Sequence, residues 1–371
     1  MNKKMIIEYR KKLSKLSKES SQFNKEESCL ICCNKVASFC NSHSLPKFIL
    51  QNVSYNGVVF QCGTMLELDN EIKGNKLGVN NAGVFYNICS SCDNLFFKDY
   101  ESIDEMEKIT SELKNNKYII SYNTKIKLCK IYYKCLLREI YTKKDDKYMN
   151  GKEFDELVRN GLFDGHQIYD NYQLDIRDYF REKSIIENII NGEGNDDIFI
   201  IDYFELPYEV SMATQALIAL QNDLKGNVIN DIYDFSKDYY IEHICLLCFP
   251  INNKTIFILF GIDVTKKRHE SFISQYKKLN LNEKLKLIQS IIFSYSDECY
   301  FSPLLNDVLL KDSDFIVMAS QANGPEITHS RIEGNHQYFY SGKVDIKNFN
   351  DIENYFSRKY SKKSLINKYI K

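Results

Sequence analysis

Hydrophobic residues after residue 195 recur in short runs of strand length. The runs are DIFIIDYFEL (197–206), SMATQALIAL (211–220), DYYIEHICLLCFP (238–250) and KTIFILFGID (254–263). Such runs are typical of strands. Ile251-Asn252-Asn253 joins the last two runs and favours a hairpin. Successive strands with short connections predict an antiparallel sheet, and hence an α+β domain.

Other segments carry apolar residues at helical spacing. Ile103, Met106, Ile109 and Leu113 form one stripe, and a second follows at Ile126, Cys129, Tyr133, Leu136, Leu137 and Ile140. Residues 145–195 are predicted to be mostly helical, and the last helix in this range is predicted to end at Gly192. We expect one more helix over 268–294. Residues 1–27 predict a basic helix that docks on the protein or contacts DNA phosphate, and residues 346–371 form a basic tail.

Composition narrows the class of protein. The chain has 371 residues, a formal net charge of -1, and an apolar share of 44%, enough for a packed core. A nucleic-acid surface would therefore be a local patch. Twelve cysteines without a secretory signal indicate a reducing, cytoplasmic compartment. No run approaches the roughly 18 apolar residues of a membrane span, so we expect no membrane partner.

Two Cys-x-x-Cys pairs carry the strongest chemical signal. They are separated by 56 residues, and their members are Cys29, Cys32, Cys89 and Cys92. Paired spacing of this kind predicts a structural Zn²⁺ site, whose four thiolates leave no open coordination position. Cys33 and Cys40 are alternatives within the first half. The competing interpretation is four reduced core cysteines.

The order of motifs resembles the HNH endonucleases, which have a ββα-metal site. The first Cys pair precedes Ser-His-Ser-Leu-Pro at 42–46, and the second pair opens a predicted helix in a treble-clef arrangement. The resemblance covers residues 28–101 and extends to uncharacterised bacterial proteins with Ser-His-x-x-Pro and a later Tyr-Glu, here Tyr100-Glu101.

The resemblance implies residue roles. His43 matches the general base that activates water against a phosphodiester. Asp93 stands where many members place a metal-ligand His, and Asn94 or Asn87 would be the middle Asn, although neither has the usual offset. The implied catalytic ion is Mg²⁺ or Mn²⁺. Ser42 replaces an Asp that the family often carries. The implied activity is metal-dependent cleavage of DNA, with RNA as the alternative substrate.

A second function remains open. In it, His43 is a buried hydrogen-bonding residue of a degenerate HNH-like site. The zinc module is then a non-catalytic scaffold that binds nucleic acid or a partner protein. An exposed His43 in a groove near Asp93 favours the nuclease, whereas a buried His43 favours the scaffold.

Other polar residues have simpler explanations. Cys245 and Cys248 lie in an apolar run and are predicted to be core residues, with His243 as a hydrogen-bonded sheet residue. The pair His329 and His336 is expected on a surface loop. The acidic cluster near a strand start is interpreted as a strand cap and solvated charge; it comprises Asp196, Asp197 and Asp202.

The predicted organisation is an HNH-like zinc module at 28–103 followed by a larger α+β domain at 104–345. The domain has a helical part at 104–195 and an antiparallel sheet with a helix at 196–345. It would supply targeting, a sensing site, or an interface for a homodimer or a partner protein. This combination is similar to effectors of bacterial anti-phage systems by analogy alone.

Overall fold

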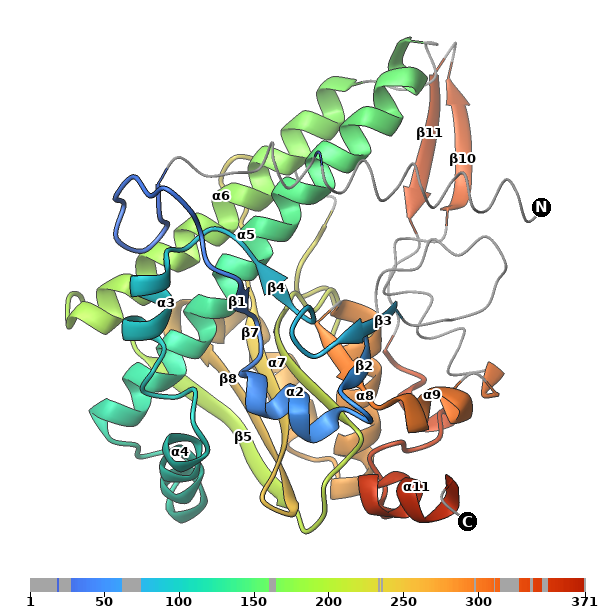
Figure 1. The fold of residues 1–371 in the computed structure, drawn as a ribbon. Coiled ribbons are helices and arrows are strands. Elements are labelled where there is room, and N and C mark those ends of the chain that lie inside the picture. The colour runs from blue at the N-terminus through green and yellow to red at the C-terminus, as the bar shows by residue number, and fades with distance from the viewer. Residues whose placement is uncertain are drawn as a thin grey trace.

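A computed structural model gives the fold of the chain (Figure 1). It describes residues 19, 28–61, 75–159, 165–232, 234, 236–296, 298–309, 311–313, 327–333, 336–341 and 346–369. The predicted basic helix at 1–27 lies outside the described residues except at Glu19. The basic tail contains two short 3-10 helices, η2 (Phe349–Asp351) and η3 (Arg358–Tyr360), and then α11 (Lys362–Tyr369).

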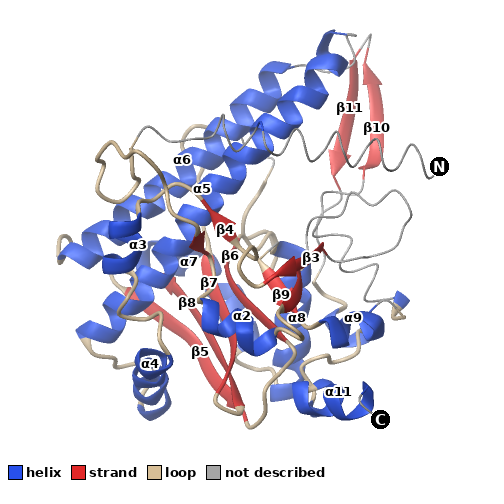
Figure 2. Cartoon of the chain, in the orientation of Figure 1, coloured by secondary structure: helices blue, strands red, loops and turns tan. Residues whose placement is uncertain are grey.

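A seven-stranded antiparallel sheet forms the centre of the molecule (Figure 2). Its order is β3-β2-β9-β6-β7-β8-β5. The strands are β2 (Val58–Gln61), β3 (Asn75–Gly78), β5 (Ile198–Leu206), β6 (Met212–Ile218), β7 (Ile244–Ile251), β8 (Lys254–Ile262) and β9 (Cys299–Phe301). The four strands predicted beyond residue 195 are confirmed as β5 to β8. The predicted α+β class with an antiparallel sheet is therefore correct.

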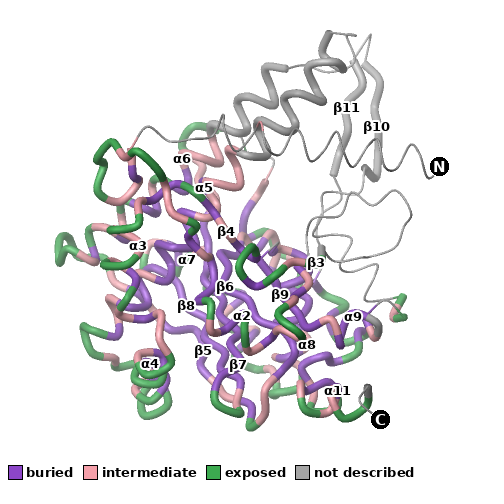
Figure 3. The backbone as a smooth tube through the Cα atoms, in the orientation of Figure 1, coloured by how far each residue is buried: buried purple, intermediate pink, exposed green. Residues whose placement is uncertain are grey.

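The β7–β8 hairpin shows why these strands are apolar along their whole length. Asn252 and Asn253 have φ values of 49° and 62°, as a two-residue type I′ turn requires. Along β7, side chains alternate between two hydrophobic cores: Cys245 and Leu247 enter one, and Leu246 and Cys248 enter the other. Both faces of the sheet are therefore buried, and the central strands carry the colour of buried residues in Figure 3.

Helices cover both faces. The first core contains side chains of α2 (Lys47–Val53), α4 (Ile103–Asn115), α5 (Tyr122–Arg159) and α6 (Gly165–Asn191). The second contains side chains of α7 (Asp263–Tyr276), α8 (Leu281–Tyr295), α9 (Pro303–Leu309) and the C-terminal segment. Helices α5 and α6 lie side by side as a long hairpin (Figure 1). Gly192, at φ 72°, follows the end of α6, as predicted.

Two expectations change. The helix predicted over 268–294 is two helices, because Asn280 begins α8 with a capping box: its side chain accepts from the Glu283 N–H, and Glu283 accepts from the Asn280 N–H. The boundary predicted near residue 103, between the zinc module and the larger domain, is crossed by the central sheet. Strand β2, from between the Cys pairs, bonds with β9, where Phe60 pairs with Phe301. The pairing joins segments about 240 residues apart, which local patterns do not reveal.

The remaining described strands form two small sheets. β1 (Ser42–His43) pairs with β4 (Val84–Phe85), and β10 (Ile327–Glu333) pairs with β11 (His336–Ser341). His329 and His336 therefore lie on hairpin strands, where a surface loop was expected. Each helix in the described part of the chain is too short or too polar to cross a lipid bilayer.

Acid destabilisation is expected to depend on His269. Its side chain is buried on α7 near His243, Glu182 and Arg268, and burial lowers its pKa to about 4. The unfolded chain then binds a proton near pH 6.5 that the folded chain resists. This group should therefore cost about 3 kcal/mol of stability as the pH falls from 6.5 to 4. Urea unfolding should show that His269→Leu loses less stability than the wild type as the pH falls from 6.5 to 4. Equal losses of stability in the two proteins would contradict the role given to His269.

Candidate metal centre and the adjoining imidazole

The four predicted cysteines converge. The sulfur atoms of Cys29, Cys32, Cys89 and Cys92 all lie within 4.8 Å of one another. Cys29 is fully buried and Cys32 is exposed, so the group lies at the edge of the first core. Cys33 and Cys40 are outside this group. The four sulfurs can hold one metal ion.

Backbone contacts bring the two pairs together. The Cys29 N–H donates to the Asn34 carbonyl at 3.0 Å, and Cys33, at φ 57°, completes the tight turn. Cys89 is the N-cap of α3 (Ser90–Phe96), and its N–H donates to the Cys29 sulfur at 3.4 Å. The Leu30 N–H donates to the Asn87 carbonyl at 3.1 Å. The first pair thus sits on a turn and the second opens a helix.

The turn also favours a thiolate. The backbone N–H of Asn34 is the largest of the influences that lower the pKa of Cys32 to about 7. Thiolates are the form of cysteine that binds metal ions. Burial and the neighbouring sulfur atoms raise the pKa of Cys92, so the preference for a thiolate applies to Cys32 and not to Cys92.

His43 lies on β1, opposite Val84 of β4. Its Nδ1 lies 2.9 Å from the Ala82 carbonyl oxygen. Because a carbonyl only accepts, Nδ1 carries the hydrogen and Nε2 keeps a lone pair. Burial lowers the pKa of His43, and the charges of Lys134 and Lys47 act in the same direction. The imidazole is thus neutral at pH 7 with a fixed tautomer, and it is only partly buried.

The residues on either side of His43 are anchored. Ser42 Oγ donates to Asp93 Oδ1 at 2.6 Å. Ser44 Oγ donates to the buried carboxylate of Glu298, which also accepts from Arg138 Nε at 2.8 Å. Both serines are buried. These bonds fix the strand that carries the imidazole.

A glycine makes this packing fit. Gly83 has φ 64°, and a Cβ there would lie 2.4 Å from Ser44 Oγ and 2.7 Å from the Tyr300 hydroxyl. The Ser44 N–H donates to the Gly83 carbonyl at 2.8 Å. Only glycine permits this approach beside the Ala82 carbonyl that orients His43.

Asp93 already has a cationic partner. Its Oδ1 lies 3.3 Å from Lys134 Nζ, and the same ammonium pairs with Glu101. Lys134 comes from α5, its side chain is 1% exposed, and Nζ lies 4.5 Å from the centre of the Phe97 ring. Burial raises the pKa of Glu101. A lysine from another helix therefore joins the two acidic residues.

These residues do not fit the Mg²⁺ or Mn²⁺ ion that the HNH resemblance implies. The carboxylates that would bind the ion hold an ammonium, which would repel it. Asn94 is exposed on α3. Asn87 is buried; its Nδ2 donates to the Leu137 carbonyl at 2.7 Å, and its Oδ1 lacks a partner among the described residues. The predicted metal ligand Asp93 is thus held by Lys134, whereas Asn94, a candidate for the middle Asn, is exposed.

Lys134, Glu298 and Arg138 were not found from the sequence. A signal for Lys134 was available, because it is the one charge within the apolar stretch IYYKCLL at 131–137. Such a lysine is buried only with a charged partner. The partner itself, from α3, could not be read from that stretch.

The interpretations of Cys245, Cys248 and His243 are confirmed, whereas that of Asp202 is wrong. Cys245 and Cys248 are fully buried in opposite cores. His243 Nδ1 lies 3.1 Å from the Glu182 carboxylate. Asp202 is not a solvated charge: it is buried within β5 (Ile198–Leu206) and pairs with Lys117 at 2.5 Å and Lys284 at 2.7 Å.

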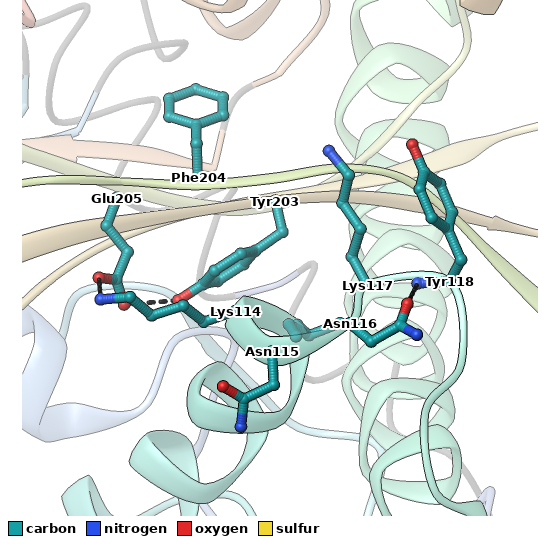
Figure 4. A pocket seen from close by; sticks show the side chains of 9 residues that line it. Lys114, Asn115, Asn116, Lys117, Tyr118, Tyr203, Phe204 and Glu205 are labelled. Carbon is teal, nitrogen blue, oxygen red and sulfur yellow. Dashed lines mark hydrogen bonds and ion pairs between the residues drawn. The ribbon is translucent and has the colours of Figure 1, made fainter.

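A cavity of about 550 Å³ lies along the outer strand β5, next to the α4–α5 connection (Figure 4). Lys114 pairs with Glu205 at 2.9 Å, and the Tyr203 hydroxyl donates to the same carboxylate at 2.5 Å. Lys117 is held by Asp202. Because these lysines already have carboxylate partners, the cavity offers little free charge to an anion. The imidazole and the cysteine group are the stronger candidates.

Comparison of the chain with protein-family models, with curated proteins and with solved structures finds no match.

Proposed function

We propose that the chain is a zinc-stabilised endonuclease of the HNH type, with a treble-clef module at its N-terminal end and His43 as general base. One observation carries the proposal: the bond between His43 Nδ1 and the Ala82 carbonyl leaves Nε2 as a neutral proton acceptor on the first strand of a β-β-α arrangement. The resemblance implies two paired strands followed by a helix. Here β1 pairs with β4 and α3 follows, with α2, β2 and β3 inserted between β1 and β4.

Zinc is the proposed occupant of the cysteine group. Four sulfurs at two C-x2-C spacings suit tetrahedral Zn²⁺. With four thiolates the ion has no open position for water or substrate. Its role would be to hold the first turn against α3, and so to place β1 and β4 beside each other.

In the proposed reaction, His43 Nε2 takes a proton from water. The resulting hydroxide oxygen bonds to phosphorus, and the bond from phosphorus to the leaving sugar oxygen breaks. The leaving oxygen keeps the bonding electron pair and takes up, through solvent, the proton that His43 received, so that Nε2 is again a base. Lys47 is exposed, and its charge acts on His43, so it is the proposed contact for the scissile phosphate. No step is assigned to a divalent ion, since Asp93 is held by Lys134.

The proposal is tested by incubating the zinc-loaded chain with supercoiled plasmid, linear duplex DNA and single-stranded RNA. Each substrate should be tried with and without Mg²⁺ or Mn²⁺. Cleavage that requires His43 supports an endonuclease and identifies its substrate. Intact substrates under all of these conditions would exclude it.

A second function is favoured by a specific contact. Lys134 neutralises Asp93, as expected if the HNH-like site has become a non-catalytic scaffold. Such a scaffold would bind nucleic acid or a protein partner through the zinc module. It predicts an electrophoretic mobility shift of nucleic acid without any cleavage, or no interaction with nucleic acid at all.

The pH dependence of cleavage should report the imidazole. Because burial lowers the pKa of His43, full activity is expected to persist below pH 6.5 and to fall only as the pH drops through the lowered value. Lys47→Gln removes a positive charge and should move this acid limb to higher pH. Lys35→Gln, on the exposed first turn, is the control that should leave it in place. An acid limb that is the same in both variants would contradict the role given to Lys47.

A further inference from the structure

We propose that the ammonium of Lys134 is the resident cation of this site, so that Asp93 and Glu101 bind no Mg²⁺ or Mn²⁺. The inference rests on the proposed HNH-type function, since that resemblance assigns a divalent ion to Asp93. It is tested by metal binding, which does not depend on cleavage.

The contacts of Lys134 support this directly. Nζ lies 3.3 Å from Asp93 Oδ1 and also pairs with the Glu101 carboxylate. Ser42 Oγ occupies a second position on Asp93 Oδ1, at 2.6 Å. A hard divalent cation needs several such oxygens free of other cations. Here the protein supplies the positive charge from its own helix.

The lysine is also unable to leave easily. Its side chain is 1% exposed, and Nζ lies over the Phe97 ring at 4.5 Å. Its neighbours Tyr133 and Cys135 are buried in the same core. Moving Nζ away would leave the partly buried carboxylates of Asp93 and Glu101 without their charge partner, which is unfavourable. An incoming ion would therefore have to displace a packed residue.

Lys130 provides a matched comparison. It lies one turn earlier on α5, pairs with Asp99 at 2.7 Å, and has Nζ 5.0 Å from the centre of the Phe96 ring. It thus repeats the same kind of contact with a single carboxylate. Its removal leaves no pair of carboxylates facing each other.

Lys134 is a positioning residue in this arrangement. It holds Asp93 in place, and Asp93 accepts the hydrogen bond from Ser42, the residue next to His43. The chain of contacts therefore runs from α5 through α3 to the strand that carries the imidazole.

The experiment is a Mn²⁺ titration, followed by electron paramagnetic resonance, of the zinc-loaded chain and its variants. We expect no Mn²⁺ bound through Asp93 in the wild type. Lys134→Met should gain about one Mn²⁺ per chain. Lys134→Met/Asp93→Asn should lose the gained site, and Lys130→Met should not gain one. Zinc content, measured in parallel, shows that Mn²⁺ has not replaced zinc.

Two results would overturn the inference: a Mn²⁺ ion bound by the wild type and lost in Asp93→Asn, or no gain of Mn²⁺ by a folded Lys134→Met. If Lys134→Met does not fold, the titration of the wild type against Asp93→Asn decides alone, because equal absence of Mn²⁺ supports the inference. Cleavage that needs both Mg²⁺ and Asp93 would overturn this inference and leave the endonuclease proposal intact.

Discussion

Replacing Cys32 by serine is expected to remove the metal ion and to lower the free energy of unfolding by about 4 kcal/mol or more. Cys32 contributes one of four sulfurs that lie within 4.8 Å of one another. Without the ion, the turn at 29–33 and the start of α3 lose their main connection. Since β2 lies between the two Cys pairs and bonds with β9, the loss should extend to the central sheet.

The neighbouring Cys33 provides the control. It is exposed like Cys32 but lies outside the four-sulfur group. Cys33→Ser should therefore retain the metal, measured by elemental analysis, and unfold in urea like the wild type. If Cys32→Ser kept its metal, or if both variants lost equal stability, the cysteine group would not be a metal centre.

The sequence was sufficient wherever one local pattern determined the structure. The C-x2-C pairs identified all four members of the sulfur group. Asn252-Asn253 indicated the β7–β8 turn, because two successive residues with positive φ favour Asn. Successive side chains of β7 and β8 alternate between two faces that are both buried, which explains why these strands are apolar without interruption. These features need no knowledge of distant residues.

Features made by distant residues could not be predicted in this way. Ser44 bonds to Glu298, which is 254 residues away in the sequence. Strand β9 follows Glu298 and pairs with β2, which is similarly distant in the sequence. Asp93 has a reasonable motif position, yet its environment is set by Lys134 on another helix. A motif specifies which side chains are present, whereas their ionic partners follow from tertiary packing. This is why the resemblance predicted a divalent ion that these contacts do not favour.

His43→Ala is expected to reduce phosphodiester cleavage by roughly 100- to 10,000-fold, the usual contribution of a positioned general base. The wild-type imidazole has its hydrogen fixed on Nδ1 by the Ala82 carbonyl, and Nε2 is the only group assigned to accept the proton of water. His43→Gln should be as inactive, because an amide can bond to that carbonyl but has no basic nitrogen. Both variants should keep the metal, since the imidazole is not one of its ligands.

Single-turnover cleavage with added imidazole distinguishes a base from a structural residue. Free imidazole should partly restore His43→Ala, whose missing ring leaves space beside β1, and restore His43→Gln less, because its longer side chain occupies that space. Unfolding midpoints close to that of the wild type would show that the loss is chemical. Cleavage within about twofold of the wild type in both variants would remove His43 from the reaction, because a base that contributes so little is not a base in the rate-limiting step.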